Sequence, residues 1–397
     1  MNVGSYLFAA SSLLVLAAAS SPVEPIVSHH NGTALSEHDL FTTGDPDEAE
    51  EADVEATAGT APVLQLRNIS KTSLPPGGNS LLVTAEMTPE LDFCVERGLE
   101  FLVDQQRDNG SFGYGRYEGH VGITALACIA LMADGHLPGR GVYGDAVERG
   151  LRFVLDHIDE TGFIAGDTVS HGPMYGHGFA TLFLGEVHGM NPFDERVHEA
   201  LNRAVAIIIN SQNDEGGWRY RPVPFDADLS VTICQVMALR SARNAGIKVP
   251  KEVIDRAIEY VHAMQNPDGG FRYMLNSGAS AWPRTAAGIA ALFYSGVHED
   301  DVIDRGLEYL MSTALPGITD RTSEPHYFYG HYYAVQAMFL AGGQYWETWW
   351  PAIREELIAT QLSDGSWPDH YAGGTYATSM SMIILQVPKR YLPIFQK

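Results

Sequence analysis

The chain has 397 residues, of which 49 are acidic and 25 are basic, so its formal net charge is −24. With 45% apolar and 10% aromatic residues it can build a large buried core, and its length suits two domains or one large one at roughly 150 residues each. This charge excludes a sequence-independent nucleic-acid binder, which needs stripes of Lys and Arg to displace counterions. It also argues against docking on anionic lipid.

The N-terminal segment differs from the rest of the chain. Residues 1–66 contain ten acidic side chains, and the first basic residue is Arg67. Residues 4–19 are almost wholly apolar or small, which is shorter than the roughly 20 residues of a membrane span. Small residues follow, ending at Ser21, as signal peptidase prefers. We predict a signal peptide over residues 1–21 and an exported protein; the alternative is an N-terminal membrane anchor.

Residues 22–87 are rich in Pro, Gly, Ser, Thr and acidic residues. Such a composition buries too little apolar surface to offset the entropy lost on ordering, so we predict a disordered acidic linker. The folded part is then residues 88–397. The three cysteines, Cys94, Cys128 and Cys234, show no CxxC spacing, and an odd number excludes a complete disulfide framework.

An internal repeat organises the chain from residue 88 onward. The phrase Arg-Gly-Leu occurs at residues 97, 149 and 305, and Arg203, Arg256 and Arg354 fill the gaps at the same spacing of about fifty residues. Each unit starts with an amphipathic helix that ends in a turn containing Gln, Gly and an aromatic residue. Four turns are well formed, at residues 106–112, 212–218, 265–271 and 361–367; the second unit has a degenerate turn and the fifth has lost it.

A second helix follows each turn and is apolar on all sides, which is typical of a buried helix. We therefore expect six outer helices that carry the charged residues and six inner helices. Six pairs can close into a ring without the polar capping repeats that an open solenoid requires. The predicted fold is all-α, an (α/α)6 toroid.

The turns and the Arg-Gly phrases resemble the QW repeat of the prenyltransferase/squalene cyclase superfamily, over about residues 88–390. The resemblance implies the terpenoid-cyclase toroid fold. It does not name an activity, because the superfamily includes triterpene cyclases, protein prenyltransferases and complement-like thioester domains.

The repeat register predicts which residues share one end of the toroid. We expect the inner helices to begin at or just after residues that include His120, His177, Asp228 and His331, with Trp282 and Tyr376 in the other two units. Each of these side chains could simply cap a helix. Three histidines and an acid at the positive ends of six helices also suggest a site, because helix N-termini favour neutral imidazole.

The sharpest motif is Asp226-Ala227-Asp228-Leu229, at the start of the third inner helix. It resembles the Asp-x-Asp-Asp motif of class II triterpene cyclases, and the resemblance implies that Asp228 is the acid that protonates an alkene and Asp226 its partner. His177 or His331 would orient the acid. The last Asp of the motif is Leu229 here, and the chain has roughly half the length of a two-domain cyclase; the alternative is a pair of capping residues.

We expect a small apolar or anionic ligand in the central cavity. The residues predicted to bind it are Trp218, Arg219, Tyr220, Tyr175, His120, Trp282, Arg272, Phe328 and Tyr329. Arg219 and Arg272 follow two of the turns in matching phrases, and they could equally be structural. Together with Arg116, Arg221 and Arg284 they predict a locally cationic mouth on an acidic chain.

The zinc pattern of protein prenyltransferases is missing, since Ser230 stands where its Cys would be and Trp282 begins the next inner helix, so no cofactor or metal is expected. The thioester motif Gly-Cys-Gly-Glu-Gln is also absent. Three functions stay open: an exported terpenoid-cyclase-like protein, a non-catalytic module that binds a ligand, a protein or a membrane periphery, and a carbohydrate-active toroid enzyme with paired carboxylates. A deep aromatic cavity favours the first, a filled centre the second and an open polar groove the third.

Overall fold

The computed structural model describes residues 86–166, 172–276, 278–318 and 324–396, all within the compact unit Arg67–Lys397. The predicted signal peptide and nearly all of the predicted linker lie outside these residues. Glu86, inside the predicted linker, is already attached to the fold, because its carboxylate accepts a hydrogen bond from the Trp346 indole (2.6 Å).

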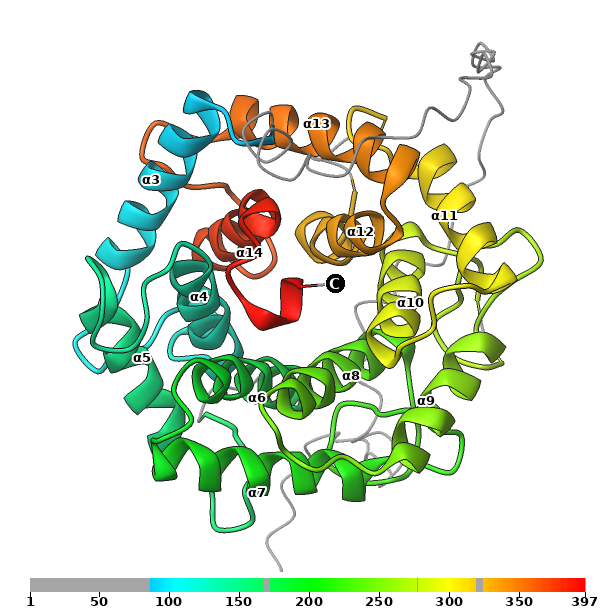
Figure 1. Cartoon of the computed structure of the whole chain (residues 1–397), viewed down its shortest axis with the longest axis horizontal. Helices are drawn as coiled ribbons and strands as arrows, with labels where there is room; N and C mark the ends of the chain where they lie inside the picture. The colour runs from blue at the N-terminus through cyan, green and yellow to red at the C-terminus, as the bar shows by residue number, and fades with distance from the viewer. Residues whose placement is uncertain (1–85, 167–171, 277, 319–323, 397) are drawn as a thin grey trace, which may run out of the picture. The chain divides into compact units, whose positions relative to one another are not determined.

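Two concentric rings of α-helices form the described part of the chain (Figure 1). The outer helices are α3 (Pro89–Asp104), α5 (Gly144–Asp156), α7 (Glu195–Ser211), α9 (Lys251–Ala263), α11 (Asp301–Thr313) and α13 (Gly343–Thr360). The inner helices are α4 (Val121–Ala133), α6 (Pro173–Met190), α8 (Leu229–Asn244), α10 (Trp282–Ser295), α12 (Tyr327–Ala341) and α14 (Gly374–Gln386). The all-α (α/α)6 toroid predicted from the repeat is confirmed.

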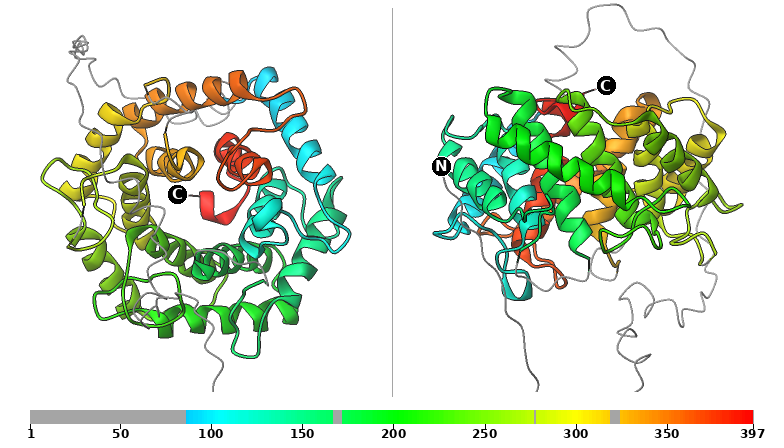
Figure 2. Two further views of the ribbon diagram at one scale, coloured as in Figure 1. Left: turned by 180° about the vertical axis from the view of Figure 1, so that it is seen from behind. Right: turned by 90° about the horizontal axis from the view of Figure 1, so that it is seen from below.

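The inner ring is closed. Each inner helix packs on the next in chain order, and α14 packs back on α4 and on α3. The same arrangement is visible from behind (Figure 2). Helix α4 is buried along its whole length, as its uniformly apolar sequence predicts. No helix in the described ranges is long and apolar enough to cross a membrane.

The Gln of each well-formed turn joins its unit to the next. The Gln212 side-chain amide donates to the carbonyl of Gly216 in its own turn (2.7 Å) and to that of Val253 in the next outer helix (2.9 Å). The Arg256 guanidinium donates to the other end of the same amide. Gly216 has φ +97°, and a Cβ there would lie 2.3 Å from the Arg256 carbonyl oxygen, so only glycine fits.

The same contact closes the ring between the last and first units. Gln361 donates to the carbonyls of Gly365 and of Cys94 on α3, both at 2.9 Å, and Arg97 on α3 donates to the Leu362 carbonyl at 2.6 Å. The Gln of the last turn therefore joins the two ends of the ring, which are more than 260 residues apart in the sequence.

The two ends of the toroid differ. At the end where the inner helices terminate, the 3-10 turn Pro393–Phe395 packs on α6 and α8 inside the ring (Figure 1). The Ile394 N–H donates there to the Glu186 carboxylate at 3.3 Å. The opposite end, where the inner helices begin, carries the loops that follow the Gln turns; we call it the loop end.

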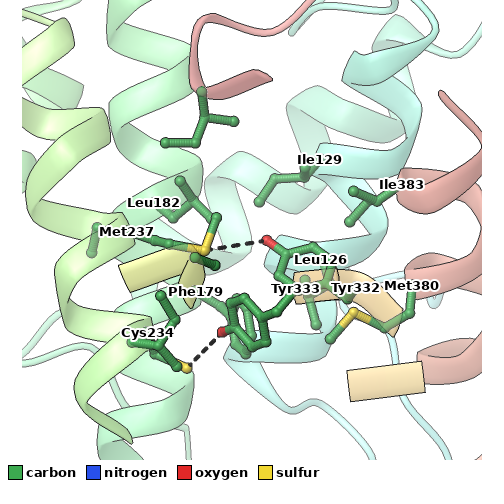
Figure 3. Packing of buried hydrophobic residues seen from close by; sticks show 14 of the residues in the cluster. Leu126, Ile129, Phe179, Leu182, Cys234, Met237, Tyr332, Tyr333, Met380 and Ile383 are labelled. Carbon is green, nitrogen blue, oxygen red and sulfur yellow. Dashed lines mark hydrogen bonds between the residues drawn. The ribbon is translucent and has the colours of Figure 1, made fainter. Parts of the chain in front are cut away.

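Apolar side chains fill the middle of the inner ring. Figure 3 shows side chains from α4, α6, α8, α12 and α14 meeting there. The hydroxyl of Tyr333 lies 3.3 Å from the Cys234 sulfur, and that of Tyr332 lies 3.9 Å from the Met237 sulfur. The sequence left open a deep aromatic cavity, a filled centre or an open polar groove. Below the first turn of the inner helices, the structure is closest to a filled centre.

Candidate functional site at the loop end

Asp228 is the N-cap of α8 and is fully buried, with 0% of its surface exposed. One carboxylate oxygen accepts the Val231 N–H at 2.8 Å. Its backbone N–H donates to the Trp218 carbonyl (3.0 Å), and its own carbonyl accepts the Thr232 hydroxyl (2.6 Å). The carboxyl group is thus held in a fixed position at the start of the helix.

Arg219 joins the two aspartates of the motif. Its guanidinium lies 3.0 Å from an Asp226 carboxylate oxygen and 3.8 Å from the second Asp228 oxygen. The Arg219 side chain is 17% exposed, so this interaction is only partly screened by solvent. A cation at this distance favours the ionised form of a buried carboxyl group.

Phenol rings surround this ion pair. The hydroxyls of Tyr220 and Tyr273 are hydrogen-bonded to each other at 2.6 Å, and the Arg219 guanidinium lies 5.0 and 5.8 Å from their ring centroids. The Tyr175 ring lies 6.1 Å from that of Tyr220. From across the ring, the Tyr329 hydroxyl donates to the Ser230 carbonyl on α8 at 3.1 Å.

Three of the phenols occupy equivalent places. Tyr175, Tyr329 and Tyr376 are the third residues of α6, α12 and α14. Burial raises the pKa of each phenol well above its usual value, and the Asp228 carboxylate raises that of Tyr175 further. Each nevertheless keeps part of its surface accessible. We call these three tyrosines, together with Tyr220 and Asp228, the vestibule; the four tyrosines are partly accessible and Asp228 is fully buried.

Two of the predicted histidines do not lie at helix starts. His177 lies in the second turn of α6; its Nδ1 accepts the Ile164 N–H and its Nε2 donates to the Ala204 carbonyl, both at 3.1 Å. Thr232 of α8 accepts the Trp218 N–H in the same way. Burial lowers the pKa of His177 to about 4, and both nitrogens are used to hold backbone, so the geometry does not favour a role in orienting Asp228.

His331 also lies one turn inside its helix, α12. It is fully buried against the rings of Trp282, Tyr327 and Trp349, and burial lowers its pKa to about 3. Within the described ranges neither ring nitrogen has a hydrogen-bond partner. It is directed towards these rings of α10, α12 and α13, away from the position expected for a partner of Asp228.

His120 is at the helix start, as predicted. It is the N-cap of α4, and its Nδ1 accepts the Gly122 and Ile123 N–H groups at 3.1 and 3.4 Å. Burial lowers its pKa to about 4, so the imidazole is neutral and carries its proton on Nε2.

Several predicted binding residues have structural positions. Trp218 is fully buried, and its indole donates to the Ile208 carbonyl of outer helix α7 at 2.7 Å. Trp282 donates to the Glu324 carboxylate (2.8 Å), and Arg272 donates to the carbonyls of Leu275 and Gln265 (3.1 and 3.3 Å). Phe328 is buried edge-on against Tyr327 at 5.1 Å. None of these contacts belongs to the vestibule.

The arginines predicted to form a cationic mouth are paired with neighbouring carboxylates and aromatic rings. Arg219 is matched by two aspartates. Arg116 is stacked between the rings of Tyr117 and Tyr371, at 4.9 and 4.8 Å, and Arg284 lies 5.6 Å from the Tyr273 ring. The arginines at the loop end are therefore largely engaged with aromatic faces and carboxylates.

Tyr273 and Tyr376 were missing from the residues predicted to bind a ligand. Tyr273 could have been found, because it ends the phrase Gly-Gly-Phe-Arg-Tyr that matches Gly-Gly-Trp-Arg-Tyr around Tyr220. Tyr376 aligns with Tyr175 and Tyr329 once the helix starts are known. In the described part of the chain, no group of three or more His, Cys, Asp or Glu side chains is placed to hold a metal ion.

Comparisons with solved structures define the fold. The type II terpene cyclase MstE from Scytonema, in a complex titled with geranylgeranyl dihydroxybenzoate as substrate, aligns with 77% of this chain and 98% of its own at 14% identity and a TM-score of 0.52. The same cyclase in complex with its product merosterolic acid A gives a TM-score of 0.54 over 75% of this chain and 96% of its own, at 15% identity. The chain has the terpenoid-cyclase toroid fold.

The toroid is shared more widely. An α-1,6-mannanase of Salegentibacter sp. HEL1_6 aligns with 76% of this chain and 99% of its own at 10% identity and a TM-score of 0.57. Among curated proteins, drimenyl diphosphate synthase of Streptantibioticus cattleyicolor is 33% identical over 116 residues, 29% of this chain. That match spans 21% of the synthase, about a fifth of its length. No family model matches the chain.

Proposed function

We propose that this protein is a terpenoid-cyclase-like enzyme that binds an apolar, isoprenoid-type ligand in the vestibule, with Asp228 as the general acid. The observation that carries the proposal is the place of Asp228: buried, fixed at the N-cap of α8, and next to desolvated phenols. The fold likeness to MstE and the local match to a terpene synthase support it.

The proposed reaction is an acid-initiated cyclisation. The Asp228 carboxyl would transfer its proton to an alkene carbon of the ligand, leaving a tertiary carbocation and a carboxylate. A second alkene of the ligand would then form the new C–C bond and carry the positive charge. Loss of a proton from a neighbouring carbon to water would end the reaction, and Asp228 would take up a proton from water again, so that product and ligand are isomers. The faces of Tyr175 and Tyr329 would stabilise the cation by cation–π attraction.

Arg219 sets a condition on this chemistry. Because its guanidinium favours the ionised form of Asp228, the acid can carry a proton only when that pair is loosened. Ligand binding against Tyr220 would act on a ring that contacts Arg219, and Tyr175 lies 6.1 Å from that ring.

The proposal is tested by incubating purified protein with geraniol, farnesol and squalene and analysing the extract by gas chromatography and mass spectrometry. We expect a cyclic isomer from at least one of them, with at least a thousand-fold loss for Asp228→Asn and unchanged ligand retention, consistent with removal of a general acid and its proton. Asp300→Asn is the matched control, because Asp300 caps outer helix α11 through the Val302 N–H at 2.7 Å. Equal activity of wild type and Asp228→Asn would refute the acid role.

A second candidate is a non-catalytic ligand-binding module, favoured by the packed middle of the ring and by the Arg219–Asp228 pair. It predicts that an isoprenoid is retained but recovered unchanged from both wild type and Asp228→Asn.

Export also stays a proposal, and it depends on the apolar residues 4–19. Cell fractionation with N-terminal sequencing of the mature protein tests it; a cytosolic chain that retains Met1 would contradict it.

A further inference from the structure

Two aromatic side chains meet across the centre of the inner ring. Phe179 comes from α6 and Tyr332 from α12, which are opposite each other because two inner helices separate them in either direction. Their ring centroids are 6.1 Å apart with the planes at 75°, an edge-to-face contact. One pair of rings thus spans the whole lumen (Figure 3).

Below this pair the lumen is packed. The side chains there include Ile129, Leu182, Met237 and Ile383, each exposed by 1% or less, while Leu126 and Met380 flank the pair at its own height. A cavity large enough for water would leave accessible surface on the residues that line it, and these have almost none. The Tyr332 hydroxyl points at the Met237 sulfur, so the ring is anchored from below.

Above the pair, side chains become partly accessible within one helical turn. Phe179 keeps 7% of its surface accessible, whereas Tyr332 has none. Tyr175 precedes Phe179 by four residues on α6, which corresponds to a rise of about 6 Å. Tyr329 and Tyr376 stand at the same height on α12 and α14. The accessible surface of the vestibule therefore ends about one helical turn below Tyr175, at Phe179.

We propose that Phe179 and Tyr332 form the floor of the ligand site and set the length of ligand that it accepts, which makes the substrate a short isoprenoid and excludes a squalene-sized chain. The inference rests on the proposed isoprenoid ligand and adds its size. A long chain would have to displace the edge-to-face pair and the packed layer of Met237 and Leu182 beneath it.

The floor is tested by measuring retention of geraniol, farnesol and squalene by wild type and by Phe179→Ala, using mass spectrometry of the protein-bound fraction. We expect wild type to retain the two short alcohols and not squalene, and Phe179→Ala to retain squalene at least tenfold better. Phe179→Leu is made in parallel, because truncation of a buried Phe can prevent folding; it should shift the preference in the same direction by a smaller factor.

Phe153→Ala is the matched control. Phe153 is a buried Phe on outer helix α5, where its ring centroid lies 4.0 Å from that of His157, so its removal opens space away from the lumen. It should leave the length preference unchanged. Squalene bound by wild type as tightly as farnesol, or an unchanged preference in folded Phe179→Leu, would overturn the floor while leaving the isoprenoid ligand in place. Retention of none of the three probes by wild type would overturn both the ligand class and the floor.

Discussion

The two ends of the inner ring each bury one carboxyl group, and they treat it differently. At the loop end, Asp228 is 0% exposed and has the Arg219 guanidinium 3.8 Å away. At the other end, Glu186 is 1% exposed and is held by the Ser241 hydroxyl (2.7 Å) and the Ile394 N–H (3.3 Å). Burial raises the pKa of Glu186 to about 7.

The two buried carboxyl groups differ in what compensates their burial. At Glu186 burial outweighs the two neutral donors, which by themselves would favour the carboxylate, and the Ile394 N–H ties the C-terminal segment to α6. At Asp228 the Arg219 guanidinium stabilises the charged carboxylate, and the phenols of Tyr220 and Tyr273 lie against that guanidinium.

The largest expected effect comes from removing the cation. Arg219→Met should lower the free energy of unfolding by about 4 kcal/mol at neutral pH, because breaking a buried pair leaves a lone charge. The loss should shrink as the pH falls, since a lone buried carboxyl group costs little once protonated. Urea denaturation from pH 5 to 8 measures this.

The double variant Arg219→Met/Asp228→Asn is the control for that experiment. It should recover most of the loss, because no charge is left without its partner. A single variant as stable as wild type at every pH would show that the two ends do not differ in this way.

The next effect is the pH dependence contributed by Glu186. Its pKa is raised in the folded state, from an ordinary value of 4.5 to about 7, so the folded protein binds the proton more tightly than the unfolded chain does. This stability is fully present below about pH 4.5 and is lost as the pH rises to about 7, a loss of about 3 kcal/mol.

Glu186→Gln should remove this pH-dependent difference, because an amide does not ionise. It should cost at most about 1 kcal/mol at low pH, since the amide oxygen can still accept the Ile394 N–H while the NH₂ donates to the Ser241 hydroxyl. Glu259→Gln, an exposed position on α9, is the control and should follow wild type. Thermal denaturation from pH 4 to 8 measures the stability of both proteins. If the stabilities of wild type and Glu186→Gln changed with pH in the same way, the assignment to Glu186 would be wrong.

The smallest expected effect concerns the phenols. Tyr220→Phe removes the hydrogen bond to the Tyr273 hydroxyl and should lower stability by about 1 kcal/mol. If the phenol contacts the ligand, the amount of ligand retained should fall even under conditions in which the variant is fully folded. Tyr391→Phe, at an exposed position outside the vestibule, should change neither.

Much of the architecture was predictable because the residues that form each turn and helix are close together in the sequence. The turn at residues 212–218 needs Gln212 for its two carbonyl contacts and Gly216 for its positive φ, and both recur in four units. The position of Asp228 at the start of α8 was also predictable, since it caps the helix where the motif placed it. Neither inference required contacts between distant helices.

The site around Asp228 was harder to predict. Trp218 looked like a cavity residue, but its indole turns outward to α7, as that of Trp367 turns to Leu357 on α13 (3.0 Å). His177 looked like a rim residue, but it occupies the second-turn position that Thr232 has in α8. An offset of one turn decides whether a side chain faces the vestibule or the backbone, and the repeat spacing fixes helix starts less finely than that.

The sequence by itself determined six helix pairs and the turns that join them, and it placed each helix along the chain to within about one turn. Only the tertiary structure decided which residues of non-adjacent inner helices meet: Tyr329 with Ser230, and Phe179 with Tyr332. The reason is physical. Periodicity records what each helix does with its own neighbours, whereas contacts across a lumen exist only after Gln361 and Cys94 have closed the ring.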